Sequence, residues 1–166
     1  RSHRNKFKSQ VVSLRYFNVY GPREKHKGSM ASIVYQLHCQ LKQGNTIKLF
    51  EGSGGYESGE QRRDFIYIDD VIKANIFFMQ NPKISGVFNI GTGRSQTFNE
   101  VATAVIKWHG QGEIEYIPFP PGLKDRYQSY TQSDISLLRQ AGYVENFFSI
   151  EEGVNAYLDK IETKIE

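Results

Sequence analysis

Three clusters of polar residues adjoin apolar segments and carry side chains capable of chemistry. They cover residues 15–23, 62–70 and 88–93. The amide of Asn18 can donate and accept hydrogen bonds, and the guanidinium of Arg63 offers a planar pair of donors that fits an oxyanion. Taken by itself, Lys27 is interpreted as a solvated loop cation, although a lysine can transfer a proton if burial or neighbouring cations lower the pKa of its amine. Because ligands of parallel α/β sheets bind beyond the carboxyl ends of strands, we expect a site near Asn18, Lys27 and Gly91.

Generic catalytic and metal-binding motifs are missing from the sequence. It has no Gly-x-Gly-x-x-Gly turn, no P-loop and no Gly-x-Ser-x-Gly elbow, and the glycines of residues 52–59 lack the spacing of a phosphate loop. Cys39 is the single cysteine, which excludes an intramolecular disulfide, and the four histidines are scattered. We therefore expect no metal site, a reducing cytoplasmic setting and a buried, inert Cys39 thiol.

Strands and helices are predicted to alternate, which favours one α/β unit with a parallel sheet. The apolar run at residues 10–18 is nearly continuous, as is typical of a strand buried on both faces. Further strands are expected at residues 46–50, 65–68, 87–90 and 113–119, and helices are expected to begin at residues 29, 71, 97, 133 and 149. Ser29 is predicted to cap the first helix, with Met30 on its apolar face, and Thr97 and Ser149 each begin a capping box. Residues 51–60 are predicted to form a mobile Gly-rich loop.

The composition is that of one soluble globular domain. The chain has 166 residues, 39% of them hydrophobic and 13% aromatic, and no apolar run is long enough to cross a bilayer. Four of the 21 Lys and Arg residues lie in residues 1–8, and 18 acidic residues balance the other 17. We interpret residues 1–9 as a basic arm, part of which can be a cloning remnant, and residues 10–166 as the α/β domain. We expect no nucleic-acid or membrane partner.

Taken in order, the three polar clusters resemble the motifs R-x-x-N-x-x-G-P, R-D-F-x-x-V-x-D-x-x-x-A and F-N-x-G. Motifs in this order and at about this separation resemble the second half of the extended short-chain dehydrogenase/reductases that act on nucleotide-sugars. The resemblance covers nearly the whole chain from about residue 10. It implies an α/β fold: the C-terminal substrate-binding portion of a Rossmann-type enzyme, with a few strands of the parallel cofactor sheet.

Further segments resemble one branch of this family, which inverts carbon 6 of an ADP-linked heptose. These are residues 23–32, 48–53, 114–120 and 126–128. The resemblance implies NADP as the cofactor, an ADP-heptose sugar-nucleotide as the substrate and a product used for the lipopolysaccharide core. It also implies a homo-oligomer, a pentamer in the family, and two acid/base groups on opposite sides of the sugar. These groups are the Tyr of a Tyr-x-x-x-Lys motif and Lys27.

The remaining site residues are carried over from the resemblance position by position. Val19 and Lys27 match cofactor-contacting positions. Substrate-binding positions match Asn18, Ser29, Gln36, Phe50, Glu51, Gly52, Ser53, Arg63 and Tyr127. Gln36 stands where the family commonly has a histidine, so that position can form a hydrogen bond but cannot carry charge. The loop between Ser53 and Arg63 is longer than is usual in the family.

Several of these positions also have a purely structural interpretation. Arg63 suits a pyrophosphate, but it could instead form an ion pair with Asp64 or Asp69. Asn18 suits a sugar hydroxyl, but it could instead cap the neighbouring Gly-Pro turn. Phe50 and Tyr127 could flank a nucleotide base, although aromatic residues at strand ends are more often part of the core.

The main departure from the family is the absence of a Tyr-x-x-x-Lys motif and of the glycine fingerprint. The resemblance implies that both lie in an N-terminal NADP-binding half, so we expect this chain alone to be inactive. Its missing half should leave an apolar patch or an unpaired sheet edge on strands 11–17 and 87–90, and therefore promote association. Two alternatives remain: another nucleotide-sugar epimerase or dehydratase of the same superfamily, and a non-catalytic module that binds sugar-nucleotides.

Overall fold

The computed structural model describes residues 9–163, in which strands and helices alternate as predicted. The basic arm predicted for residues 1–9 lies, apart from Ser9, outside the described residues. The strands are β1 (Val12–Tyr16), β2 (Asn18–Tyr20), β3 (Thr46–Phe50), β4 (Arg62–Arg63), β5 (Phe65–Tyr67), β6 (Gly86–Ile90), β7 (Gln96–Thr97) and β8 (Glu113–Ile117). The helices are α1 (Ile33–Gln43), α2 (Ile68–Gln80), α3 (Phe98–His109), α4 (Ser136–Gln140) and α5 (Ile150–Glu162), with 3-10 segments η2 (Lys25–Met30) and η3 (Lys124–Arg126).

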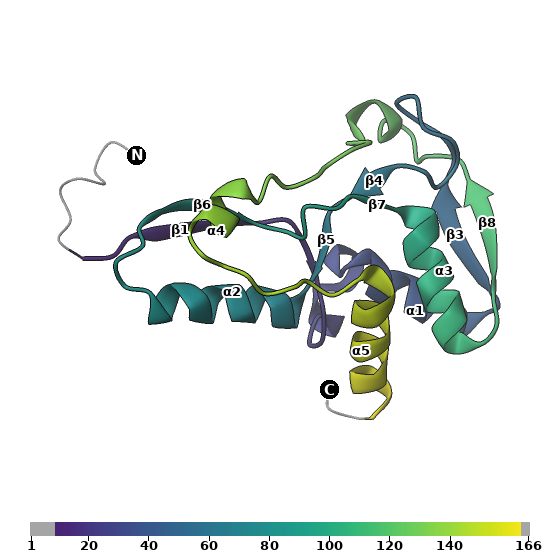
Figure 1. Ribbon diagram of the computed structural model, residues 1–166. Coiled ribbons are helices and arrows are strands. Elements are labelled where there is room, and N and C mark those ends of the chain that lie inside the picture. The colour runs from purple at the N-terminus through teal and green to yellow at the C-terminus, as the bar shows by residue number, and fades with distance from the viewer. Residues whose placement is uncertain (1–8, 164–166) are drawn as a thin grey trace.

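Strand pairing joins segments that are far apart in the sequence. The pairs β1–β6, β2–β5 and β3–β8 are parallel, and β4–β7 is antiparallel. Figure 1 shows β1 and β6 beside α2 at one end of the molecule and β3 and β8 beside α1 and α3 at the other, with β5 between them. The predicted α/β class with parallel pairing is confirmed.

The single strand predicted at residues 10–18 is in fact two strands, which pair with different partners. The Phe17 N–H donates to the carbonyl of Ile90 at 3.0 Å, on the β6 side. The next N–H, that of Asn18, donates to the carbonyl of Asp64 at 3.0 Å, on the β5 side. The chain therefore changes neighbours at Phe17, and this change places Asn18 beside Asp64.

The prediction that this strand is buried on both faces is wrong for β1. Within residues 9–163 it pairs with β6 alone, and the Tyr16 side chain is 49% exposed. The predicted unpaired sheet edge is thereby confirmed. An isolated pair of parallel strands is unusual, because parallel sheets are normally covered on both faces.

Helix α1 begins at Ile33 and is capped by Ser32, not by Ser29 as predicted. The Ser32 hydroxyl accepts the Tyr35 N–H at 3.3 Å. The reason is a bend at Gly28, whose φ of 55° interrupts the preceding 3-10 segment. The bend leaves Met30 83% exposed rather than on the apolar face. Gly44 follows the last helical residue, as predicted.

The other predicted helices are confirmed, with two shifted starts. Capping boxes form at Thr97 with Glu100 and at Ser149 with Glu152. Helix α2 begins at Ile68, three residues earlier than predicted. Helix α4 begins at residue 136, three residues later, and buried Ser133 instead donates to the Asp64 carboxylate.

The Gly-rich segment at residues 51–60 has little regular structure, as predicted, but hydrogen bonds fix it at several points. A short bridge joins Ser53 to Tyr56. The Gly59 N–H donates to the carbonyl of Phe50 at 3.1 Å, and the Asn99 N–H donates to the carbonyl of Gly59 at 3.0 Å. The segment is thus tied to the first turn of α3, while its mobility stays a prediction.

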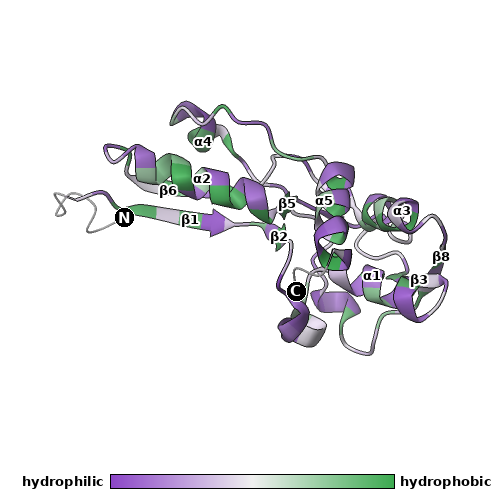
Figure 2. Ribbon diagram, turned by 90° about the horizontal axis from the view of Figure 1, so that it is seen from below, coloured by the Kyte–Doolittle hydropathy of each residue, from purple (hydrophilic) through white to green (hydrophobic). Residues whose placement is uncertain are grey.

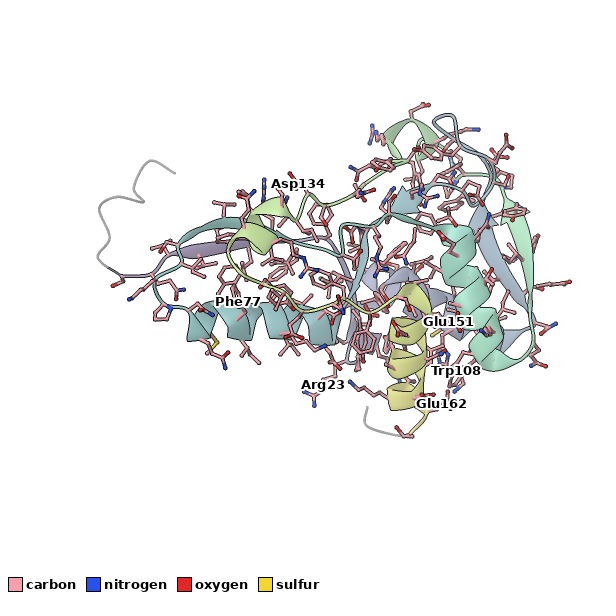
Figure 3. All side chains as sticks on the ribbon, in the orientation of Figure 1. Arg23, Phe77, Trp108, Asp134, Glu151 and Glu162 are labelled. Carbon is pink, nitrogen blue, oxygen red and sulfur yellow. The ribbon has the colours of Figure 1, made fainter. Side chains whose placement is uncertain are left out.

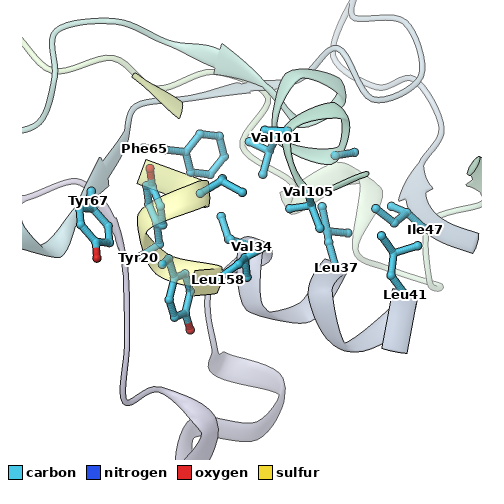
Figure 4. Close-up of a cluster of buried hydrophobic side chains, with 14 of the residues drawn as sticks. Tyr20, Val34, Leu37, Leu41, Ile47, Phe65, Tyr67, Val101, Val105 and Leu158 are labelled. Carbon is cyan, nitrogen blue, oxygen red and sulfur yellow. The ribbon is translucent and has the colours of Figure 1, made fainter. Parts of the chain in front are cut away.

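Two buried clusters form the core. The larger joins β2, β3 and β5 to α1, α3 and α5, and Figure 4 shows Val34, Leu37, Val101, Val105 and Leu158 meeting there. The smaller, around Ile66, Phe78 and Leu138, joins α2, β6 and α4. Cys39 lies on α1 and is half-buried. None of the described helices is long and apolar enough to span a lipid bilayer.

Two histidines meet between α1 and α3, next to the end of α5. His38 is buried, and its Nδ1 lies 3.0 Å from Nε2 of His109. His38 Nε2 lies 3.6 Å from the Glu162 carboxylate, which also accepts from Lys42 at 2.7 Å. Figure 3 shows Trp108 and Glu162 at this junction. Burial lowers the pKa of His109, against an opposing effect of Glu162 and with a smaller lowering effect of Lys42.

We expect acid to destabilise this junction through His109. Because the folded protein lowers the pKa of His109 below its ordinary value of 6.5, the unfolded chain binds the proton more readily. Stability is therefore complete above pH 6.5 and falls as the pH drops below that value. Urea unfolding at pH 7.5 and 5.5 should show a lower midpoint at pH 5.5. The difference should shrink in His109→Gln, and an unchanged difference would contradict this origin.

Exposed apolar residues accompany the free edge of β1. Ile72, Ile76 and Met79 are 47%, 45% and 77% exposed and recur along one face of α2. Figure 2 shows apolar residues along α2 and at the start of β1. An open strand edge beside an apolar helix face favours association.

We expect the chain to self-associate through this face. Ile76→Lys should shift the weight-average mass, measured by sedimentation equilibrium at micromolar concentration, toward that of the monomer. Met30→Lys, on an exposed methionine of η2, serves as the control and should leave the mass unchanged. Equal effects of the two substitutions would place the association elsewhere.

Candidate functional site

A cavity of 260 Å³ lies where β2, the start of α1, β5 and the start of α3 converge. Its lining consists of Asn18, Val19, Tyr20, Ala31, Ser32, Ile33, Arg63, Phe65, Phe98 and Tyr127. The fold thus brings together four of the predicted site residues: Asn18, Val19, Arg63 and Tyr127. The polar side chains of Asn18, Ser32 and Arg63 lie among aromatic and aliphatic ones, which is typical of a small-molecule site.

Arg63 is the single strong charge in this cavity lining, and it is 9% exposed. Its guanidinium donates to the carbonyl of Arg62 at 2.9 Å and lies 5.2 Å from the ring centre of Tyr127 and 5.8 Å from that of Phe98. Burial lowers its pKa, while the nearby Tyr127 acts in the opposite direction. No carboxylate among residues 9–163 pairs with it.

The two carboxylates offered as alternative partners of Arg63 are engaged elsewhere. Asp69 pairs with Lys160 at 2.9 Å. Asp64 is fully buried and accepts hydrogen bonds from Thr92, Gly93 and Ser133. The ion-pair alternative for Arg63 is therefore wrong in this structure. A buried cation held by rings and one carbonyl retains donors for an anionic ligand.

Asn18 is held at the cavity by the strand switch described above. Its side-chain amide donates to the carbonyl of Asp64 at 3.1 Å, next to the backbone hydrogen bond from the same residue. No bond to the Gly21-Pro22 turn is present, so the capping alternative is not what the structure shows. With the amide nitrogen fixed, the side-chain oxygen is available to accept from a ligand hydroxyl.

Phe50 and Tyr127 contact one another rather than leaving a slot between them. Their ring centres are 5.9 Å apart at an interplanar angle of 85°. Phe119 stacks on Phe50 with centres 4.6 Å apart and meets Tyr127 at 5.0 Å. Burial raises the pKa of Tyr127, and the neighbouring Arg63 opposes the rise. A base could thus lie against this cluster, but not between these two rings as they stand.

Three predicted residues of the chain segment around Ala31–Ile33 are not part of the cavity lining. Lys27 and Ser29 are exposed on η2, which leads into the Ala31–Ile33 wall. The Gln36 side chain donates to the carbonyls of Ser29 and Ala31, at 3.2 and 2.7 Å. In this position Gln36 braces the wall.

The predicted residues 51–53 directly follow Phe50, the last residue of β3 and a member of the aromatic cluster. The Glu51 carboxylate accepts from Lys124 at 3.2 Å, and Ser53 is buried, with its hydroxyl accepting from Gln61 at 3.2 Å. A Cβ at Gly52 would lie 2.5 Å from the carbonyl oxygen of Tyr56, so this position requires glycine. Their contact with a substrate stays a prediction.

Six of the ten residues that line the cavity were not predicted as site residues from the sequence, and Phe98 and Ser32 are two of them. Phe98 contacts Arg63, and Ser32 lines the same cavity. Phe98 follows the Thr97 cap, and β4–β7 pairing brings Arg63 opposite Gln96. The sequence carries no local signal for that antiparallel pair.

One of the cavity residues, Val19, is predicted to contact a cofactor. Val19 lines the cavity from the middle of β2, opposite Ile66 of β5. The glycine turn that follows β6, at residues 91–93, donates to the Asp64 carboxylate and lies outside the cavity lining, so the contact of Val19 with a cofactor stays a prediction. Within the described residues, no group of three or more His, Cys, Asp or Glu side chains could hold a metal ion.

Comparison with known proteins agrees with this geometry. The model of the family described as "NAD dependent epimerase/dehydratase family" matches residues 1–91, over half of the chain. The chain belongs to the NAD dependent epimerase/dehydratase family. This membership confirms the resemblance and the fold class predicted from the three motifs.

Individual members of the family are similar over nearly the whole chain. The ADP-L-glycero-D-manno-heptose-6-epimerase of Alkalilimnicola ehrlichii is 57% identical over 153 residues, which are 92% of this chain and 48% of that protein. The crystal structure of the enzyme of the same name from Helicobacter pylori is 36% identical, with a TM-score of 0.82 over 97% of this chain and 46% of that chain. The UDP-N-acetylglucosamine 4-epimerase of Methanobrevibacter ruminantium, solved with UDP-N-acetylmuramic acid, is 25% identical, with a TM-score of 0.80 over 99% and 50%. The chain thus spans about half the length of these relatives.

Proposed function

We propose that this chain is the substrate-binding portion of an epimerase that inverts carbon 6 of an ADP-linked heptose with NADP. The observation that carries the proposal is Arg63, a buried cation without an acidic partner in residues 9–163, set in a cavity with Asn18 and Tyr127. The 57% identity to a heptose epimerase supports this substrate over other sugar-nucleotides. The product would serve the lipopolysaccharide core, and the complete protein would be a cytoplasmic homo-oligomer, a pentamer.

Each part of such a substrate has a counterpart in the cavity region. Arg63 would hold the pyrophosphate, because its planar donors match two phosphate oxygens. Asn18 would bind a sugar hydroxyl through its free side-chain oxygen. The adenine would lie against the cluster formed by Phe50, Phe119 and Tyr127, where ring stacking requires no specific hydrogen bond.

Inversion at carbon 6 requires proton transfer on both faces of the sugar. Lys27 would hold or release the proton of the oxygen at carbon 6 on one face. When bound, the nicotinamide cofactor supplies the uptake and return of hydride. Val19 would contact its edge at the cavity. The second acid/base group would be a tyrosine of the N-terminal half, so the 166-residue chain alone should not turn over substrate.

The test is to incubate the full-length protein with NADP and one epimer of ADP-heptose and to follow carbon 6 by NMR. A mixture of the two epimers is the expected result, and Lys27→Met should slow its formation about 100- to 10,000-fold, leaving a measurable residual turnover. Conversion of UDP-glucose instead of ADP-heptose would contradict the proposed substrate and would support the alternative, a different epimerase of the family. Absence of any conversion, with ADP-heptose still bound, would support a binding module. A sedimentation measurement on the same sample tests the pentamer.

A further inference from the structure

Glu24 is a buried carboxylate that the proposed chemistry does not use. It is 3% exposed and lies one residue before η2. Its oxygens accept the N–H of Ser32 at 2.8 Å, the hydroxyl of Ser32 and the phenol of Tyr157 at 2.8 Å. Lys27 Nζ lies 3.9 Å from the same carboxylate. A buried acid with this many donors is specifically held, because an unpaired buried charge is costly.

These contacts close the segment that carries Lys27 into a loop. Glu24 stands at its start and Ser32 at its end, so their hydrogen bonds join its two ends. Within it, the Lys27 N–H donates to the carbonyl of Glu24 at 2.9 Å, and Gly28 bends the backbone. Ser32 also caps α1, so the closed loop continues directly into the helix.

The residue before Glu24 has an unusual backbone conformation. Arg23 has a φ of 69°, in the left-handed region that residues other than glycine rarely adopt. Such a conformation is strained and persists where surrounding contacts hold it. The Glu24 contacts to α1 and to Tyr157 on α5 are contacts of that kind.

We propose that Glu24 is a positioning residue, which holds the Lys27 segment against α1 and α5 so that the amine meets the sugar at a fixed place. This inference rests on the proposed function, because it assigns the purpose of the loop to Lys27. Without Glu24 the amine would stay in the chain but move over a range of positions. A displacement of about 1 Å at a reacting group can cost about 100-fold in rate.

A double-mutant cycle in the full-length protein separates this role from general stabilisation. Glu24→Gln keeps the size of the side chain, but its amide nitrogen cannot accept from Ser32 or Tyr157. We expect kcat to fall about 10- to 100-fold with KM changed less than about 3-fold. In the Lys27→Met background the same substitution should lower residual turnover less than about 2-fold. An equal loss in both backgrounds would overturn the proposal.

The matched control is Glu151→Gln, which removes the acid of an exposed pair with Lys107 on α3. Figure 3 places Glu151 at the start of α5. This variant should keep wild-type turnover, because exposed pairs contribute little.

Hydrogen exchange provides a measurement that needs neither substrate nor turnover. Glu24→Gln should speed amide exchange at residues 25–32 by at least about 10-fold and leave α3 within about 2-fold. Faster exchange throughout α1, α3 and α5, or no change at residues 25–32, would overturn the positioning role. If the wild-type protein does not convert ADP-heptose, the proposed function fails, and the exchange result still decides whether Glu24 holds the Lys27 segment.

Discussion

Arg63→Met is expected to weaken the binding of ADP to the full-length protein about 100-fold without lowering the melting temperature. Losing one partner of a buried charge pair costs about 2–5 kcal/mol of binding free energy, and a 100-fold loss corresponds to about 2.8 kcal/mol. The folded protein without ligand gains little from the charge, since burial lowers the pKa of Arg63 and no described carboxylate compensates it. Methionine keeps the contact with Phe98 and Tyr127 without a charge to desolvate.

The two halves of this expectation are measured by calorimetric titration with ADP and by thermal unfolding without ligand. Arg62→Met is the matched control. Arg62 does not line the cavity, and its guanidinium donates to the hydroxyl and carbonyl of Ser95, at 3.1 and 2.7 Å. That variant should keep its affinity for ADP and lose some stability. Unchanged affinity in Arg63→Met would remove the pyrophosphate role and, with it, the main support for the proposed substrate.

Features encoded by neighbouring residues were predictable from the sequence. The capping boxes at Thr97 and Ser149 begin α3 and α5 where predicted, because each box is completed within four residues. Asp69 and Asp70 lie in the first turn of α2, where the helix dipole favours acids. Parallel pairing also followed from the alternation of apolar strands with helices.

Features that depend on distant partners were not predictable. Residues 10–18 form a nearly continuous apolar run that predicts one strand, yet the strand breaks at Phe17, because Ile90 and Asp64 offer separate acceptors. Ser29 and Ser32 are equally good caps by type, and the choice of Ser32 depends on Glu24 and the bend at Gly28. We predicted that Phe50 and Tyr127 could flank a base. Nothing in the sequence indicated that Phe119 would stack on Phe50 and occupy the space beside it.

Arg63 shows how far sequence reasoning reaches for the site. Its type indicated an oxyanion ligand, but two aspartates nearby in the sequence offered an equally simple ion pair. The structure distinguishes the two alternatives. Asp64 accepts from Thr92 and Ser133, and Asp69 accepts from Lys160, so neither aspartate pairs with Arg63. Side-chain direction at a strand end depends on the packing of several segments and cannot be read from spacing.

Asp64→Asn is expected to cause the largest loss of stability, because the Asp64 carboxylate ties three segments together at the carboxyl ends of the strands. It accepts five hydrogen bonds, from the N–H and hydroxyl of Thr92, the N–H of Gly93, and the N–H and hydroxyl of Ser133. A Cβ at Gly91 would lie 2.8 Å from this carboxylate, so there is no room for a larger residue beside it. In Asp64→Asn, an NH2 group would replace one of the two carboxylate oxygens. This group is itself a donor, so the N–H and O–H groups that face it would lose their acceptor.

The cost of Asp64→Asn should be about 3–5 kcal/mol, the range found when a buried charge network loses one member. Urea unfolding measures it, and Asp69→Asn is the matched control, since that carboxylate pairs with Lys160 where both side chains are about 40% exposed. The control should cost less than about 1 kcal/mol. Because Asp64 also holds Asn18 through its carbonyl, the variant should weaken ADP-heptose binding as well as stability. A loss for Asp64→Asn no larger than for the control would mean that the three segments hold their positions without this carboxylate.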